Sequence, residues 1–230
     1  MGHAIDDFLA TGQAARLRVC SPMFDDDEIP VKTLFRTLDE MPLIEQEALR
    51  LSCGQILDVG AGAGCHSLAL QHMSKQVTAI DISPLAVRAM SRRGVRDARQ
   101  QDFFEMQGRF DTILMMMNGI GIVGTLERMP AFFMHLDGLL APGGQLLCDS
   151  SDICYVYEDD EGIIDLTGVE GYYGELTYTM RYKAIKGDPF PWLFVDPATL
   201  AEVARAAGYK VEVVIKGDHY DYLARVTRLA

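Results

Sequence analysis

The feature that most constrains the fold of this chain is a short apolar run that leads directly into a glycine-rich turn. The run 56–59 (Ile-Leu-Asp-Val) precedes the segment 60–64, whose sequence is Gly-Ala-Gly-Ala-Gly. Glycine tolerates positive φ and has no Cβ, so Gly60 and Gly62 allow the backbone to pass close to a ligand, while Gly64 allows tight packing where a helix begins. The pattern therefore predicts a buried strand, a ligand-binding turn and a helix, in that order.

A carboxylate at the end of the next predicted strand, 77–81, strengthens this interpretation. Asp81 follows Gly64 by 17 residues, and a carboxylate there can accept hydrogen bonds from both hydroxyls of a ribose. The same pair of features also suits an NAD(P)-dependent oxidoreductase, which is one alternative. The glycine spacing opposes it, because the dinucleotide motif needs a glycine three positions after Gly62, where this chain has Cys65.

Residues 55–150 alternate between strand-length apolar runs and segments with helical periodicity, which is typical of βαβ units that build a parallel sheet. Serine and proline at positions 83 and 84 are suited to the N-cap and first turn of one of these helices. The predicted strands of this part are 55–59, 77–81, 95–99, 110–117 and 145–148.

The C-terminal part adds a helix that opens at Asp196 and Pro197, followed by two strands, 209–215 and 222–226, around a tight turn at 216–218. We therefore predict an α/β fold: a doubly wound, seven-stranded, mostly parallel sheet with a C-terminal antiparallel hairpin and helices on both faces.

The length favours one core with appendages over two independent domains. Residues 1–51 are expected to form a mostly helical segment that caps the cofactor cleft, and 52–230 the main domain. Residues 152–195 interrupt its rhythm, are rich in tyrosine and include an alternating stretch at 175–185 that is typical of an antiparallel strand. We interpret them as an insertion that serves as a substrate lid.

With these features in place, the chain resembles the class I S-adenosylmethionine-dependent methyltransferase family over roughly 55–150 and again over 196–228. The resemblance implies a Rossmann-like methyltransferase fold, S-adenosyl-L-methionine as cofactor and S-adenosyl-L-homocysteine as product. The family's first motif holds the methionine part of the cofactor. The matching residues here are Asp58, Gly60, Ala61, Gly62 and Gly64.

Two further motifs of the family have counterparts that imply contacts with the adenosine part of the cofactor. Asp81 matches the carboxylate that binds the ribose, and Ile82 matches the apolar residue beside the adenine. Asp102 resembles the acid that faces the adenine amino group, next to an aromatic side chain, which here is Phe103.

Methyl transfer from a sulfonium requires alignment of nucleophile, methyl and sulfur, and it needs no nucleophilic side chain from the protein. In the family the end of the fourth strand lies nearest the transferred methyl, and Met117 and Asn118 occupy that position here. Candidates to orient or deprotonate the acceptor are Asn118, Tyr172, Tyr173 and Glu175. The sequence does not identify the catalytic residue, nor whether O, N, S or C is methylated.

Several motifs are absent from the sequence. No Asn-Pro-Pro-Tyr follows the fourth strand, which argues against methylation of the amino groups of DNA bases or glutamine, and the carboxylate set of metal-dependent catechol enzymes is missing, so no metal is expected. A cofactor-binding module without turnover is a second alternative, in which these site residues persist but no acceptor is methylated.

Charge and composition indicate the partners. The formal net charge of −12 disfavours a nucleic-acid substrate, whose phosphates call for a basic surface, and leaves a small molecule as the expected acceptor. No apolar stretch is long enough to span a membrane, and no secretion signal is apparent. Five cysteines without a Cys-x-x-Cys pair favour reduced thiols in the cytoplasm. The oligomeric state is left open.

Overall fold

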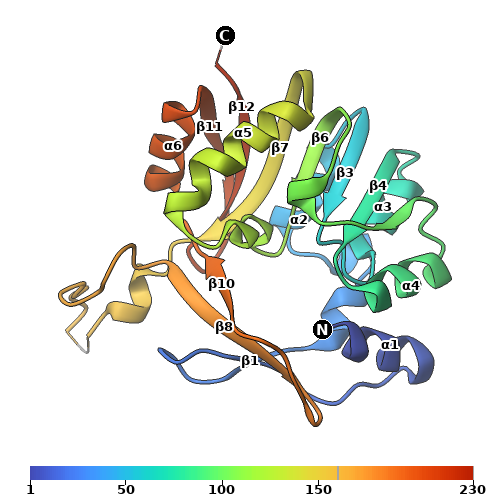
Figure 1. Cartoon of the computed structure of the whole chain (residues 1–230), viewed down its shortest axis with the longest axis horizontal. Helices are drawn as coiled ribbons and strands as arrows, with labels where there is room; N and C mark the ends of the chain where they lie inside the picture. The colour runs from blue at the N-terminus through green and yellow to red at the C-terminus, as the bar shows by residue number, and fades with distance from the viewer. Residues whose placement is uncertain (160, 230) are drawn as a thin grey trace.

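A seven-stranded sheet forms the centre of the molecule in the computed structural model, which describes residues 1–159 and 161–229 (Figure 1). Its strand order is β11-β12-β7-β6-β3-β4-β5, and β12 runs antiparallel to both β7 and β11. The remaining pairs are parallel, so the predicted fold class is confirmed. The strands are β3 (Gln55–Val59), β4 (Gln76–Asp81), β5 (Ala98–Gln100), β6 (Phe110–Met115), β7 (Leu140–Ser151), β11 (Tyr209–Lys216) and β12 (Asp221–Arg228).

Helices cover both faces of this sheet, because its strands are apolar on both sides. Side chains of α5 and α6 pack on one face with Leu57 and Ile113, while α2 and α3 pack on the other with Ile56 and Leu114. The helices are α1 (Gly2–Thr11), α2 (Leu43–Leu51), α3 (Cys65–His72), α4 (Pro84–Arg93), α5 (Met129–Leu139) and α6 (Pro197–Ala206).

A second, antiparallel sheet lies across the end of the main sheet at which β7 finishes (Figure 1). Its order is β10-β8-β1-β2, and β9 pairs with β8. It joins two segments that are more than 150 positions apart in sequence, since Leu17 of β1 lies opposite Tyr182 of β8. Its strands are β1 (Leu17–Cys20), β2 (Asp27–Ile29), β8 (Glu175–Tyr182), β9 (Ile185–Lys186) and β10 (Phe190–Leu193).

The structure differs from the sequence prediction in this second sheet and at some element ends. The N-terminal segment contains β1 and β2 beside its helices, two strands that the sequence did not predict. Strand β6 ends at Met115 because Met117 and Asn118 have φ of 62° and 55°, outside the extended region. Residues 141–144 bulge out between β6 and β7, since the ladder passes from the pair Phe110/Leu140 to Thr112/Gln145.

Gly64 gives a test of the packing at the start of α3. Its φ is +79°, and a Cβ there would lie 2.9 Å from Val95 Cγ2 and 3.0 Å from Met90 Cγ. Gly64→Ala should therefore lower the free energy of unfolding by about 2–5 kcal/mol, the sum of left-handed strain and overpacking. Urea unfolding followed by circular dichroism measures this loss.

Gly208 is the matched control, because its φ is +84° and a Cβ there would meet no atom within 4 Å. Gly208→Ala should lower the free energy of unfolding only by the backbone term of about 1–2 kcal/mol. Equal losses for the two variants would contradict close packing at Gly64.

Candidate active site

The glycine loop between β3 and α3 has the backbone that a close ligand approach requires. Gly60 and Gly62 have φ of 66° and 56°, a region that side-chain-bearing residues rarely adopt. A Cβ on Gly60 would meet nothing within 4 Å, and one on Gly62 would meet only the Gly60 carbonyl oxygen, at 3.9 Å. Open space therefore lies beside both residues, and added side chains would project into it.

Asp81 connects this loop to the next helix. Its Oδ2 accepts a hydrogen bond from the Gly62 N–H at 2.9 Å, and its Oδ1 accepts one from the Ser83 N–H at 2.8 Å. Burial raises the pKa of Asp81, and the two backbone donors partly offset this rise. Each carboxylate oxygen has a further lone pair that can accept from a hydroxyl of a bound ligand.

Asp58 lies at the end of β3, beneath the glycine loop, and is buried. Its Oδ2 accepts a hydrogen bond from Ser67 Oγ at 2.5 Å, and burial raises its pKa. This carboxylate therefore holds the first turn of α3 against the end of the strand.

The residues matched to the adenine differ in their surroundings. Ile82 is 72% exposed, so its side chain is available to a flat apolar ligand. Asp102 caps a short 3₁₀ turn by accepting from the Phe104 N–H at 2.8 Å. Phe103 is buried in the core, where its ring packs against Phe132.

The turn after β6 is strained and is held by hydrogen bonds to two elements, β7 and β10. Two consecutive non-glycine residues, Met117 and Asn118, adopt left-handed backbone, at a cost of about 1–2 kcal/mol each. The Asn118 N–H donates to Asp149 Oδ1 at 2.9 Å, and its side-chain amide donates to the Leu193 carbonyl at 3.2 Å. Its Oδ1 accepts from Ser150 Oγ at 2.9 Å. The side chain of Asn118 thus fastens β10 to β7.

The three candidates from the insertion make contacts within the chain. The Tyr172 hydroxyl donates to Asp196 Oδ2 at 2.7 Å, and the Tyr173 hydroxyl donates to Asp152 Oδ1 at 2.7 Å. Glu175 Oε1 accepts from the Leu126 N–H at 2.8 Å. The structure brings the two tyrosine rings together, 4.6 Å apart. Tyr172 and Glu175 anchor the insertion to the main domain, whereas the bond of Tyr173 lies within the insertion.

A half-buried acid that the sequence analysis did not single out lies at the end of β7. Asp149 is held by the Asn118 N–H, and burial raises its pKa to about 7. The charge of Glu45 raises this pKa further, whereas that of His66 lowers it. The available signal was its place just after the predicted strand 145–148, at the edge where parallel strands carry their sites.

Arg36, Glu45 and His66 form a largely buried cluster of charged side chains near α2 and α3. Arg36 donates from one nitrogen to both oxygens of Glu45, at 2.7 and 2.9 Å, and His66 Nε2 lies 2.7 Å from Glu45 Oε2. Burial by itself would lower the pKa of His66, but Cys65 and Glu45 outweigh it and raise that pKa well above its ordinary value. The cluster joins α2 and the preceding segment, which contains Arg36, to the first turn of α3.

Two features are absent from the described residues. Within 1–159 and 161–229, no three His, Cys, Asp or Glu side chains are grouped so that they could hold a metal ion. No helix of that part of the chain is both long and apolar enough to cross a membrane.

Comparison with known proteins gives three kinds of match. A family model described as a methyltransferase domain matches residues 56–144. A crystal structure of an S-adenosylmethionine-dependent methyltransferase from Bacteroides fragilis, in complex with S-adenosyl-L-homocysteine, is 54% identical, covers 100% of this chain and 94% of its own, and superposes with a TM-score of 0.93. The CcbJ methyltransferase from Streptomyces caelestis, at 15% identity, TM-score 0.60 and coverage of 84% and 95%, shares the fold.

Curated relatives are ubiquinone biosynthesis O-methyltransferases. The relative from Xanthomonas euvesicatoria pv. vesicatoria is 32% identical in an alignment of 180 residues that covers 72% of this chain and 66% of the relative. The relative from Xylella fastidiosa is 32% identical in an alignment of 170 residues that covers 71% of this chain and 64% of the relative. The chain therefore spans just under two thirds of the length of these relatives.

The buried cluster leads to a prediction about stability. Glu45→Ala leaves Arg36 and His66 buried without their shared carboxylate, so the free energy of unfolding should fall by about 3–5 kcal/mol. Urea unfolding at neutral pH measures the loss.

Glu47→Ala is the matched control on the same helix, because Glu47 pairs with the largely exposed Arg50. Removal of this surface pair should lower the free energy of unfolding by no more than about 1 kcal/mol. If Glu45→Ala lowered the free energy of unfolding by as little as Glu47→Ala, the buried cluster would contribute little to stability.

Proposed function

Because the chain belongs to the S-adenosylmethionine-dependent methyltransferase family, we propose that it transfers the methyl group of this cofactor to a hydroxyl of a small molecule. The choice of a hydroxyl rests on the relatives named O-methyltransferases. The family assignment argues against the oxidoreductase alternative. Cofactor binding without turnover is one possible outcome of a turnover assay.

The observation that carries the proposal is the link between the open glycine loop and Asp81. The Gly62 N–H holds the carboxylate beside a stretch of backbone that has free space where side chains would be. We propose that Asp58, Gly60, Ala61, Gly62 and Gly64 bind the methionine part of the cofactor and that Asp81 binds its ribose. Adenine would lie near the exposed Ile82, with the capped turn at 102–103 beside it.

When bound, S-adenosylmethionine supplies an activated methyl group, and the protein must hold the acceptor in line with it and remove its proton. We propose Asp149 for the second task. Its carboxylate accepts a hydrogen bond from the turn after β6, it is half-buried, and a pKa of about 7 lets it exist as a base at neutral pH. The bonds of Asn118, Tyr172, Tyr173 and Glu175 suit positioning roles, with Met117 beside the cofactor.

The second sheet and the N-terminal segment would then enclose the acceptor. We propose that 1–51 and the insertion 152–195 exclude water from the site, since both contribute strands to the second sheet, which lies at the end of the main sheet where Asp149 is found (Figure 1). A small acceptor, no nucleic acid and a cytoplasmic location agree with the charge of −12 and the five free cysteines.

Cofactor binding tests the role of Asp81. Asp81→Ala should weaken binding of S-adenosyl-L-homocysteine by about 1–3 kcal/mol, roughly 5- to 150-fold, because a charged acceptor for the ribose hydroxyls is lost. Isothermal titration calorimetry measures the change, with Asp39→Ala, an exposed acid on a 3₁₀ turn, as the control. Unchanged affinity in Asp81→Ala, or tight binding of NADH by the wild type, would overturn this assignment.

Turnover tests the role of Asp149. With an acceptor found by screening phenols and hydroxy acids for release of S-adenosyl-L-homocysteine, the rate should fall below about pH 7, because the protonated carboxyl cannot accept a proton. Asp149→Asn should lower kcat by about 10²- to 10⁴-fold and abolish this pH limb, while cofactor affinity stays within about twofold.

Asp25→Asn, which alters an exposed acid, controls for the loss of a negative charge. A variant at Asp149 that retains full activity and the same pH limb would exclude it as the base. Cofactor binding with no methylated product from any acceptor would favour a module without turnover.

A further inference from the structure

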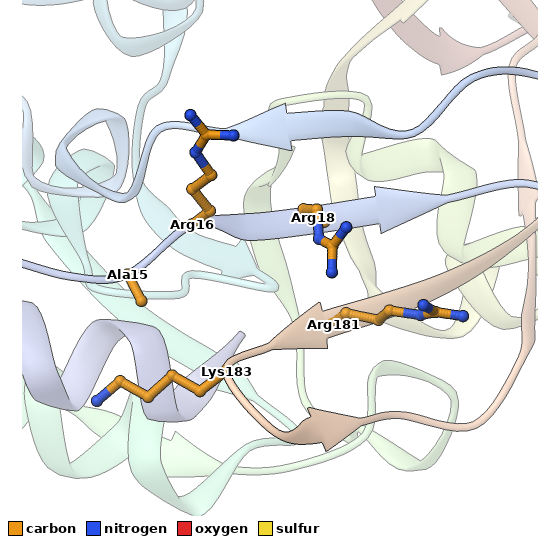
Figure 2. A pocket seen from close by; sticks show the side chains of 5 residues that line it. All are labelled: Ala15, Arg16, Arg18, Arg181 and Lys183. Carbon is orange, nitrogen blue, oxygen red and sulfur yellow. The ribbon is translucent and has the colours of Figure 1, made fainter.

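Four cations gather on the outer side of the second sheet. Arg16 and Arg18 project from the β1 segment, and Arg181 and Lys183 from the β8 segment, and together with Ala15 they line a surface hollow of about 260 Å³ (Figure 2). In Figure 2 the guanidinium of Arg18 is directed toward β8, on the side of Arg181.

The register of the ladder places like charges opposite one another. Arg18 is the direct partner of Arg181, and the adjacent pair, Leu17 and Tyr182, is buried on the other side of the sheet. On its other side Arg181 is paired with Lys186 of β9, so three cations lie in one row across three strands, and Glu28 of β2 ends the row beyond Arg18. Like charges directly opposite each other destabilise an antiparallel pair.

Nearby acids balance this charge only in part. Glu28 lies 3.5 Å from Arg16, and Asp26 lies 3.6 Å from Arg18, both in exposed pairs of the kind that contribute little. Lys183 has a closer partner in Asp7, at 2.5 Å. Among the residues that the structure describes, no carboxylate comes within 4.0 Å of Arg181.

We infer that this hollow is a binding site for a small, multiply charged oxyanion of the phosphate class. Arginine presents a planar fork of donors that matches phosphate oxygens, and Arg18 and Arg181 offer two such forks from adjacent strands. The attraction of each guanidinium group to a bound anion would outweigh the repulsion between the two groups. Among the described residues Arg181 has no carboxylate within 4.0 Å, and an external anion would supply the partner that it lacks.

The size and position of the hollow define the ligand further. At about 260 Å³ it is below the range of about 300–1,000 Å³ that is typical of drug-sized ligands, so it suits a di- or triphosphate group. It lies on the side of the β1–β8 ladder opposite to buried Leu17 and Tyr182, and none of its lining residues belongs to the glycine loop or neighbours Asp149. The site is thus additional to the one proposed for methyl transfer.

Calorimetric titration with inorganic pyrophosphate at low ionic strength tests the inference. The wild type should bind one pyrophosphate, and the double variant R18Q/R181Q should bind it at least tenfold more weakly. The matched control R96Q/R205Q removes two exposed arginines of the main domain and should change the affinity less than twofold. No binding by the wild type, or equal weakening in both variants, would overturn the site.

Thermal unfolding gives an independent readout. Without anion and at low salt, R18Q/R181Q should unfold at a higher temperature than the wild type, because a repulsive pair has been removed. Pyrophosphate should raise the Tm of the wild type and leave that of the variant unchanged. Retained affinity for S-adenosyl-L-homocysteine shows that the variant is folded, and an equal rise in Tm with pyrophosphate would contradict the inference.

Discussion

The hydrogen bond from the Gly62 N–H to the Asp81 carboxylate is the contact on which the arrangement of the site depends. It connects the loop after β3 to the end of β4, and the same carboxylate accepts the Ser83 N–H at the start of α4. Two βα units are thereby fixed at their carboxyl ends, where parallel sheets bind ligands. The loop can adopt this geometry only because positive φ at Gly60 and Gly62 is unstrained for glycine.

The acceptor side of the molecule is held by a different device. Asn118 occupies a strained backbone position. Its backbone N–H and its side-chain oxygen bond to β7, and its side-chain NH₂ bonds to β10. Such strain persists only where surrounding contacts compensate for it, and it is concentrated at functional sites. Because β10 belongs to the second sheet, Asn118 links the turn after β6, which bonds to Asp149, to this second sheet.

Charge is distributed unevenly in this acidic protein. In the buried group of Arg36, Glu45 and His66, two cationic side chains share one carboxylate, and this group joins α2 to α3 near the half-buried Asp149. The exposed cations of β1 and β8 are only partly balanced. The first arrangement depends on a carboxylate within the chain, whose removal would leave buried cations unpaired, whereas the second becomes favourable when an external anion is present.

The sequence by itself determined the main sheet, because the alternation of strands and helices and the glycine loop at 60–64 are local patterns read over a few residues. It also placed Asp81 at the end of a strand and predicted the C-terminal hairpin, which the structure has as β11 and β12. Only the tertiary structure decided the second sheet, where Leu17 meets Tyr182, and the groups around Asp149. Those contacts join residues far apart in the chain, and neither periodicity nor spacing encodes which distant strand or helix will pack beside another.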